Sequence, residues 1–141
     1  MNTILDSDAL VGMFYEQDPH YTNANFLIKQ TVEQKANIYI LPTTLNEFAL
    51  VASSRIGMAK THNAISVIRK TNYPTIEITD ELTSQATHLY LQQTSKEESL
   101  FDCFVMAAAK KIHADCIFSF DKCYTKNGFV LLEDYLKKKK M

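Results

Sequence analysis

Short apolar runs alternate with longer amphipathic segments along this chain, which predicts strands and helices that follow one another. Runs rich in β-branched and aromatic residues predict five strands, at 3–5, 37–41, 75–78, 115–120 and 129–132. Apolar residues that recur every three or four positions predict helices at 8–15, 19–32, 43–57, 60–70, 80–93 and 99–113. A short lysine-rich helix is expected to close the chain.

Alternating strands and helices require crossover connections, and these favour a mainly parallel sheet with helices on both faces. We therefore expect an α/β fold, a three-layer α/β/α sandwich with about five strands. The 141 residues have the length of one domain and show no repeat or linker, so a single domain over residues 1–141 is expected.

Short polar signals mark the expected helix starts. Asp18 and Pro19 would open the second helix, as a capping carboxylate and a proline in the first helical position. Its apolar stripe would include Phe26, Leu27 and Val32. Segments 44–47 and 99–102 both match the capping box, in which the final acid accepts from a backbone N–H. Each acid alone therefore has a structural explanation.

Composition narrows the class of protein. Apolar residues make up 46% and charged residues 22%, as in ordinary globular proteins. The longest apolar run, from Cys103 to Ala109, is far shorter than the ~20 residues of a membrane span, and the acidic N-terminus lacks the features of a secretory signal. A cytoplasmic protein with three reduced, mostly buried cysteines is expected. The four histidines show no zinc-binding spacing.

The charge pattern gives little indication of a nucleic-acid surface. The net charge is −1, so the chain has no general basic field. The run Lys137–Lys140 is either a solvated helix end or a loose contact with a phosphate backbone. Arg55, Lys60 and Arg69, on the middle helices, are candidates for phosphate contacts or simply solvated.

Four acids are expected to lie at the same edge of the predicted sheet. In an open parallel sheet, ligands gather outside the carboxyl ends of the strands. Asp6 and Asp121 directly follow predicted strands, and Glu47 lies near the start of the helix after another. Asp102 joins them if its helix begins at the same edge. Four such carboxylates repel one another unless they bind protons or a cation, and oxygen ligands favour Mg²⁺ or Mn²⁺ over zinc. Such an ion can activate water against a phosphodiester.

Four stretches resemble the PIN domain family, in particular the VapC-like toxin ribonucleases of bacterial toxin–antitoxin pairs. They are ILDSDALV, PTTLNEFA, SLFDCFVMAAAKK and IFSFDKCYTKNGF, and with residues 18–21 they extend over essentially the whole chain. The resemblance implies a five-stranded parallel sandwich and hydrolysis of single-stranded RNA with Mg²⁺ or Mn²⁺. It also implies a homodimer and a small antitoxin that occludes the site.

The resemblance also assigns roles to individual residues. It implies that Asp6 and Asp102 are direct metal ligands, and that Glu47 and Asp121 help to place water or hold a second ion. Ser119 lies where the family often has a hydroxyl residue beside the last acid, which implies an orienting role.

Two alternatives stay open from the residues. The opening Ile4–Asp8 resembles that of haloacid-dehalogenase-type phosphatases, in which Asp6 would be a nucleophile, although Leu10 and the lack of an Asp-Asp pair depart from that pattern. The other alternative is a non-catalytic PIN-like binding module whose acids cap helices or face a partner. Asp8 is expected to face solvent or to start a helix rather than to bind a metal.

Overall fold

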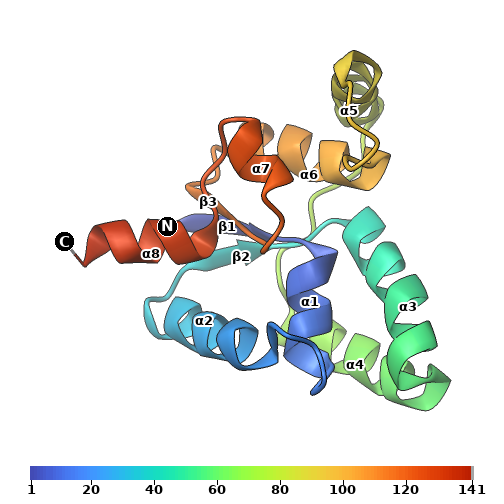
Figure 1. Cartoon of the computed structure of the whole chain (residues 1–141), viewed down its shortest axis with the longest axis vertical. Helices are drawn as coiled ribbons and strands as arrows, with labels where there is room; N and C mark the ends of the chain where they lie inside the picture. The colour runs from blue at the N-terminus through green and yellow to red at the C-terminus, as the bar shows by residue number, and fades with distance from the viewer. Residues whose placement is uncertain (141) are drawn as a thin grey trace.

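A short parallel sheet lies at the centre of the molecule (Figure 1). In the computed structural model, which describes residues 1–140, the strands are β1 (Asn2–Leu5), β2 (Asn37–Tyr39) and β3 (Cys116–Phe118). Their order is β2-β1-β3, and β1 pairs in parallel with both neighbours. The expected parallel α/β fold is therefore confirmed.

The sheet has three strands where five were expected. Two expected strands shrink to single parallel bridges, in which Thr75 pairs with Ile40 beside β2 and Leu131 pairs with Ile117 beside β3. A helix begins at Leu132, immediately after the second bridge, and another begins shortly after the first. The chain therefore leaves the sheet before a longer ladder can form.

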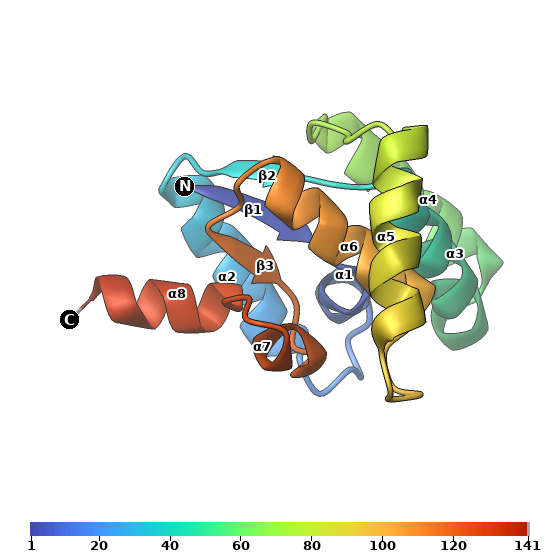
Figure 2. The same ribbon diagram turned by 90° about the horizontal axis from the view of Figure 1, so that it is seen from above.

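Helices cover both faces of the sheet, as Figures 1 and 2 show from two directions. The face of α5, α6 and α7 is opposite the face of α1 to α4. The bounds are α1 (Ser7–Phe14), α2 (Tyr21–Glu33), α3 (Pro42–Ile56), α4 (Met58–Thr71), α5 (Asp80–Gln92), α6 (Leu100–Lys111), α7 (Cys123–Lys126) and α8 (Leu132–Lys139). The short helix α7 was not predicted.

Two hydrophobic clusters fill the space on either side of the sheet. Along β1, Ile4 belongs to the cluster under α5 and α6, whereas Leu5 belongs to the cluster that contains α1 to α4 residues. In β3, Ile117 belongs to the first of these clusters and Phe118 to the second. Because successive side chains of a strand point to opposite faces, each strand contributes to both cores. The three-layer arrangement follows directly.

The start of α2 differs from the sequence-based expectation. The helix begins at Tyr21, and Asp18 precedes it in a turn where its Oδ1 accepts from the backbone N–H of His20 at 2.8 Å. Phe26 and Val32 are exposed rather than packed. Of the predicted stripe only Leu27 is buried, beside Ala24 and Thr31.

Glycine permits two close or unusual backbone arrangements. A Cβ at Gly12 of α1 would lie 3.1 Å from the Cβ of Ala24, so the small residue allows α2 to pack tightly against α1. Gly57 has φ +85° and joins α3 to α4, a conformation that favours glycine. Gly12 thus serves the contact between α1 and α2, and Gly57 serves the turn between α3 and α4.

Two further expectations concern membranes and cysteines. Within residues 1–140, no helix combines the length and the apolar character that a bilayer span requires. All three cysteines are buried and free, which confirms the prediction of reduced, buried thiols.

Candidate active site

The carboxyl ends of the strands bring together acids from distant parts of the chain. Asp6 follows β1 and caps α1, Glu47 lies on α3, Asp102 lies in the first turn of α6 and Asp121 follows β3. A fifth acid, Asp8, lies on α1. We call this set the acidic edge; it consists of Asp6, Asp8, Glu47, Asp102 and Asp121.

A tyrosine hydroxyl links two of these carboxylates. Tyr124 of α7 is fully buried, and its hydroxyl lies 2.6 Å from Oδ2 of Asp6 and 3.3 Å from Oδ1 of Asp102. The other oxygen of Asp6 accepts from the backbone N–H of Ser7 at 2.8 Å. Asp6 and Asp102 therefore face the same hydroxyl, although more than ninety residues separate them in sequence. No sequence pattern indicated this role for Tyr124, because α7 was not predicted.

The capping-box interpretation is wrong for Glu47. Helix α3 begins at Pro42 with Leu41 as its N-cap residue, so Thr44 already lies inside the helix. Glu47 accepts a hydrogen bond from the Ser7 hydroxyl instead. Its carboxylate thus belongs to the acidic edge and caps nothing.

The same interpretation is correct for Asp102, which nevertheless also reaches the site. Its Oδ2 accepts from the backbone N–H of Ser99 at 2.9 Å, and the Ser99 hydroxyl accepts from the backbone N–H of Asp102. The second oxygen, Oδ1, faces Tyr124. One carboxylate therefore holds the helix end and presents an oxygen to the acidic edge.

Asp8 does not face solvent, contrary to one of the two expectations for it. Its Oδ2 accepts from the Ser119 hydroxyl at 2.9 Å and from the backbone N–H of Phe120 at 2.8 Å. The same Ser119 oxygen accepts from the backbone N–H of Asp121 at 3.0 Å. Asp8 thus fastens α1 to the segment that carries Asp121. Its position two residues after Asp6 was the only sequence signal.

Burial and mutual repulsion dominate the electrostatics here. Burial raises the pKa of Asp6 well above its usual value, and Asp8 adds to the shift. Burial is also the main cause of the raised pKa of Asp8, Glu47 and Asp102. In the described part of the chain, no Lys, Arg or His makes an ion pair with any member of the acidic edge. Its charge is therefore balanced only by bound protons or by a cation from solution.

The donor set fits a hard divalent cation. Ligand atoms of Asp102, Asp121 and Cys123 all lie within 4.8 Å of one another. Burial raises the pKa of the Cys123 thiol, and the neighbouring Asp102 raises it further, so this sulfur stays protonated. The carboxylates remain, and carboxylate oxygens are the ligands that Mg²⁺ and Mn²⁺ prefer. Asp102, Asp121 and the adjacent Asp6 are the residues that would hold such an ion.

The family model described as PIN domain matches residues 3–129 of the chain. The chain belongs to the PIN domain family. This confirms the resemblance seen in the sequence, and the match includes every member of the acidic edge. No curated protein matches this PIN domain in a search by sequence.

Solved structures show the same fold. VapC20 of Mycobacterium tuberculosis, described as a sarcin-ricin loop cleaving toxin, superposes with a TM-score of 0.78 at 19% identity, over 91% of this chain and 96% of that one. VapBC2 of Rickettsia felis, bound to a promoter DNA fragment, superposes with a TM-score of 0.64 at 15% identity, over 93% of this chain and 97% of that one. VapBC-1 of nontypeable Haemophilus influenzae superposes with a TM-score of 0.66 at 12% identity, over 96% of this chain and 99% of that one.

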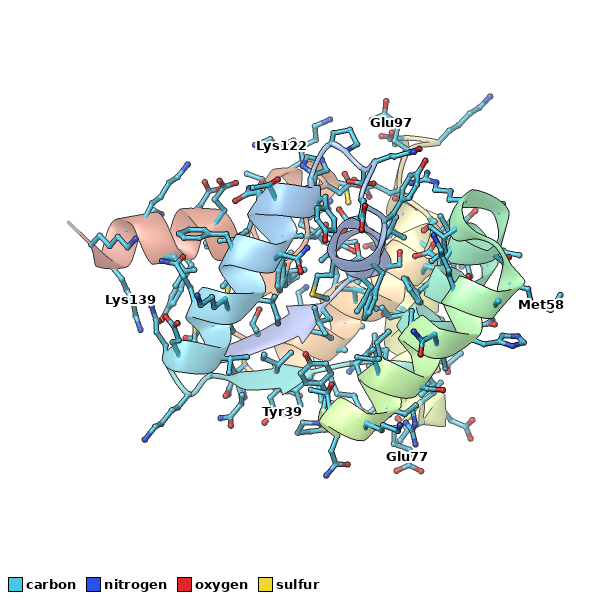
Figure 3. The ribbon with its side chains drawn as sticks, turned by 90° about the horizontal axis from the view of Figure 1, so that it is seen from below. Tyr39, Met58, Glu77, Glu97, Lys122 and Lys139 are labelled. Carbon is cyan, nitrogen blue, oxygen red and sulfur yellow. The ribbon has the colours of Figure 1, made fainter. Side chains whose placement is uncertain are left out.

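Other surface features lie away from the acidic edge of this PIN domain. A cavity of about 660 Å³ between α5 and α6 is lined by Lys110 and His113, toward the end of α6 opposite to Asp102. Figure 3 shows Lys139 on α8, well separated from Lys122, which directly follows Asp121. In the same helix, Lys137 pairs with Glu133 at 3.7 Å. The lysine-rich segment thus forms an exposed helix end remote from the acids.

Proposed function

We propose that this PIN domain is a Mg²⁺- or Mn²⁺-dependent endoribonuclease that hydrolyses phosphodiester bonds of single-stranded RNA in the cytoplasm. The observation that carries the proposal is the acidic edge, where five carboxylates converge without a basic partner among residues 1–140. Such an arrangement is costly for a purely structural role, because each buried carboxylate loses hydration without gaining an opposite charge. A cation-binding role explains it.

Burial divides the acids into two groups. Asp6 and Asp102 are buried and share the Tyr124 hydroxyl, which suits them as ligands of one ion. The chemistry that such an ion supplies is polarisation of a phosphate oxygen and a lower pKa for bound water. Glu47 is partly exposed and Asp121 is exposed, so these two can reach an attacking water or a second ion. Ser119 positions Asp121 through the latter's backbone N–H.

The cellular role and the partners are part of the same proposal. The similar solved structures include one described as a toxin and two described as VapBC. We infer that this chain is the toxin of a toxin–antitoxin pair, that it forms a homodimer and that a small antitoxin protein occludes its acidic edge. Expression without the antitoxin should then arrest growth, and substitution of Asp6 should abolish the arrest.

The two alternatives fit the site less well. In a phosphatase of the haloacid-dehalogenase type, Asp6 alone would be the nucleophile, and the convergence of Glu47, Asp102 and Asp121 on the same edge would have no role. A non-catalytic module needs no acid at Glu47, which caps no helix. The experiment below separates this second alternative from a nuclease.

An RNA cleavage assay tests the proposal. Purified protein is incubated with single-stranded RNA in EDTA and in Mn²⁺, beside the variants Asp6→Asn and Glu77→Gln. Glu77 is an acid on the loop before α5, and Figure 3 shows it remote from Lys122, which directly follows Asp121. We expect cleavage only with Mn²⁺, loss of cleavage in Asp6→Asn and unchanged cleavage in Glu77→Gln. Cleavage that is independent of Asp6 would contradict the proposal.

A further inference from the structure

Two cavities continue from the acidic edge and share one basic residue. The smaller, of about 220 Å³, is lined by Asp8 and Glu47 at the acidic edge and by Arg55. The larger, of about 490 Å³, is lined by Arg55, Lys60 and Tyr15. We call the two together the Arg55 groove. Its larger part is lined by residues at the C-terminal ends of α1 and α3 and by the first half of α4, elements that lie together in Figure 1.

Helix periodicity explains how α3 forms one wall of this groove. Glu47, Val51 and Arg55 are spaced by four residues, so their side chains lie on one face of the helix, and all three line the smaller cavity. Eight residues of α helix rise about 12 Å. The backbone of Arg55 therefore lies about 12 Å beyond that of Glu47, on the side where a phosphate further along a strand would lie.

Arg55 is held in place yet keeps donors for a ligand. Its Nη1 lies 3.6 Å from Oδ2 of Asp18, and its side chain is 48% exposed. A guanidinium has five N–H donors, so this single contact leaves most of them available, and their planar geometry suits phosphate. Glu16 also lines the larger cavity, where it opposes Arg55 and Lys60. Asp18 already pairs with Arg55, so Lys60 is the cation of the larger cavity that makes no ion pair within residues 1–140.

A stacked pair of aromatic rings lies at the smaller cavity. The rings of His20 and Phe120 stack with centroids 4.1 Å apart and planes inclined by 5°. His20 lines the smaller cavity and is an exposed residue, and Phe120 directly precedes Asp121. A flat ring beside phosphate-binding side chains is a usual means by which proteins bind unpaired bases.

We propose that the Arg55 groove binds the strand of RNA next to the scissile bond, with Arg55 and Lys60 on successive phosphates and a base against His20. This inference rests on the proposed function and adds the path of the substrate. The structure also distinguishes between Arg55, Lys60 and Arg69, the three basic residues that the sequence offers for phosphate contacts. Arg69 lies on α4 like Lys60, but it lines other cavities, beside Tyr73 and Thr75. Only two of the three belong to the groove.

Binding of a fluorescent single-stranded RNA, measured by anisotropy at several salt concentrations, tests the inference. The Asp6→Asn background prevents cleavage during the measurement. We expect Arg55→Ala and Lys60→Ala each to weaken binding about three- to ten-fold, as the loss of a charge-assisted phosphate contact should. The double variant should make the logarithmic salt dependence shallower by about 1.4, because each phosphate contact with a single strand contributes about 0.7. The matched control Arg69→Ala should bind like its parent.

Cleavage kinetics give a second readout. They are measured in the chain that retains Asp6. Arg55→Ala and Lys60→Ala should raise KM while kcat stays within about two-fold, since neither residue belongs to the acidic edge. Equal RNA affinity and equal salt dependence in the double variant and in Arg69→Ala would overturn the inference and leave the groove to a protein ligand. Failure of the parent chain to cleave RNA would instead contradict the proposed function, and the binding measurement would still decide about the groove.

Discussion

The hydroxyl of Tyr124 donates a hydrogen bond of 2.6 Å to Oδ2 of Asp6 in a site from which water is largely excluded. The same hydroxyl lies 3.3 Å from Asp102. It supplies one proton where two carboxylates would otherwise face each other. In the ion-free protein, Tyr124 thus takes part of the role that a cation would have.

Replacement of Tyr124 by Phe should therefore have opposite effects on stability and on metal affinity. Without metal, we expect the free energy of unfolding to fall by about 1–2 kcal/mol, because buried Asp6 loses its partner. With saturating Mn²⁺ the deficit should shrink, since the cation replaces the missing hydroxyl, and calorimetry should show tighter Mn²⁺ binding than in the parent chain. Urea unfolding with EDTA and with Mn²⁺ measures the first effect.

The control for this variant is Tyr135→Phe. Tyr135 lies on α8, and its hydroxyl makes no hydrogen bond within residues 1–140. This control should leave both stability and Mn²⁺ affinity unchanged. An equal stability deficit in Tyr124→Phe with and without Mn²⁺ would mean that the hydroxyl serves packing alone.

Ser119 should be more important than an ordinary buried serine. Its hydroxyl donates to Asp8 and accepts from the backbone N–H of Asp121, so Ser119→Ala removes one of the two donors to Oδ2 of Asp8 and leaves the backbone N–H of Asp121 without its partner. We expect a loss of about 1–3 kcal/mol in unfolding free energy and weaker Mn²⁺ binding, as Asp121 is no longer held. Ser119→Thr should restore most of the metal affinity. Ser53→Ala, which removes an exposed hydroxyl within α3, should change neither quantity.

Direct metal titration tests the proposed ligands. Calorimetry should show Mn²⁺ binding to the parent chain and to Glu77→Gln, and a loss of at least about 100-fold in affinity in the double variant Asp6→Asn, Asp102→Asn. At a hundred times the dissociation constant, Mn²⁺ should stabilise the parent chain by about 2.7 kcal/mol. Equal affinity in the parent chain and the double variant would exclude both acids as ligands.

The raised pKa values of the acidic edge predict how stability depends on pH. The pKa values of Asp6, Asp8, Glu47 and Asp102 lie above their unfolded values of about 4, so the folded chain binds more protons than the unfolded chain as pH rises from there. The contribution of these carboxyl groups to the free energy of unfolding is fully present below about pH 4. It is lost as pH rises through the pKa values of the folded chain. Urea unfolding in EDTA should therefore show a lower stability at pH 8 than at pH 5.

Added Mn²⁺ should weaken or reverse this dependence on pH, because the ion binds the deprotonated carboxylates. Asp6→Asn should also flatten it in EDTA, since one of the raised groups no longer titrates. A stability in EDTA that rises from pH 5 to pH 8 in the parent chain and is unaffected by Asp6→Asn would contradict the assignment.

Local patterns were sufficient for much of the fold and for most of the candidate site. The alternation of apolar runs and amphipathic segments predicted the parallel three-layer arrangement, because strand and helix periodicities are properties of neighbouring residues. The positions of Asp6, Asp121 and Glu47 after strands predicted a common edge, because parallel strands place their carboxyl ends on one side. The extra strands and the start of α2 were wrong, since pairing length and packing depend on distant contacts.

The sequence by itself determined the layers, the order of the acids and their family. Only the tertiary structure decided what each acid does: that Glu47 caps nothing, that Asp102 serves two purposes and that Asp8 is joined to Ser119. It also placed a tyrosine hydroxyl between Asp6 and Asp102 and Arg55 at the end of a groove. The physical reason is that hydrogen-bond partners and burial are set by residues far apart in the chain, which no local pattern records.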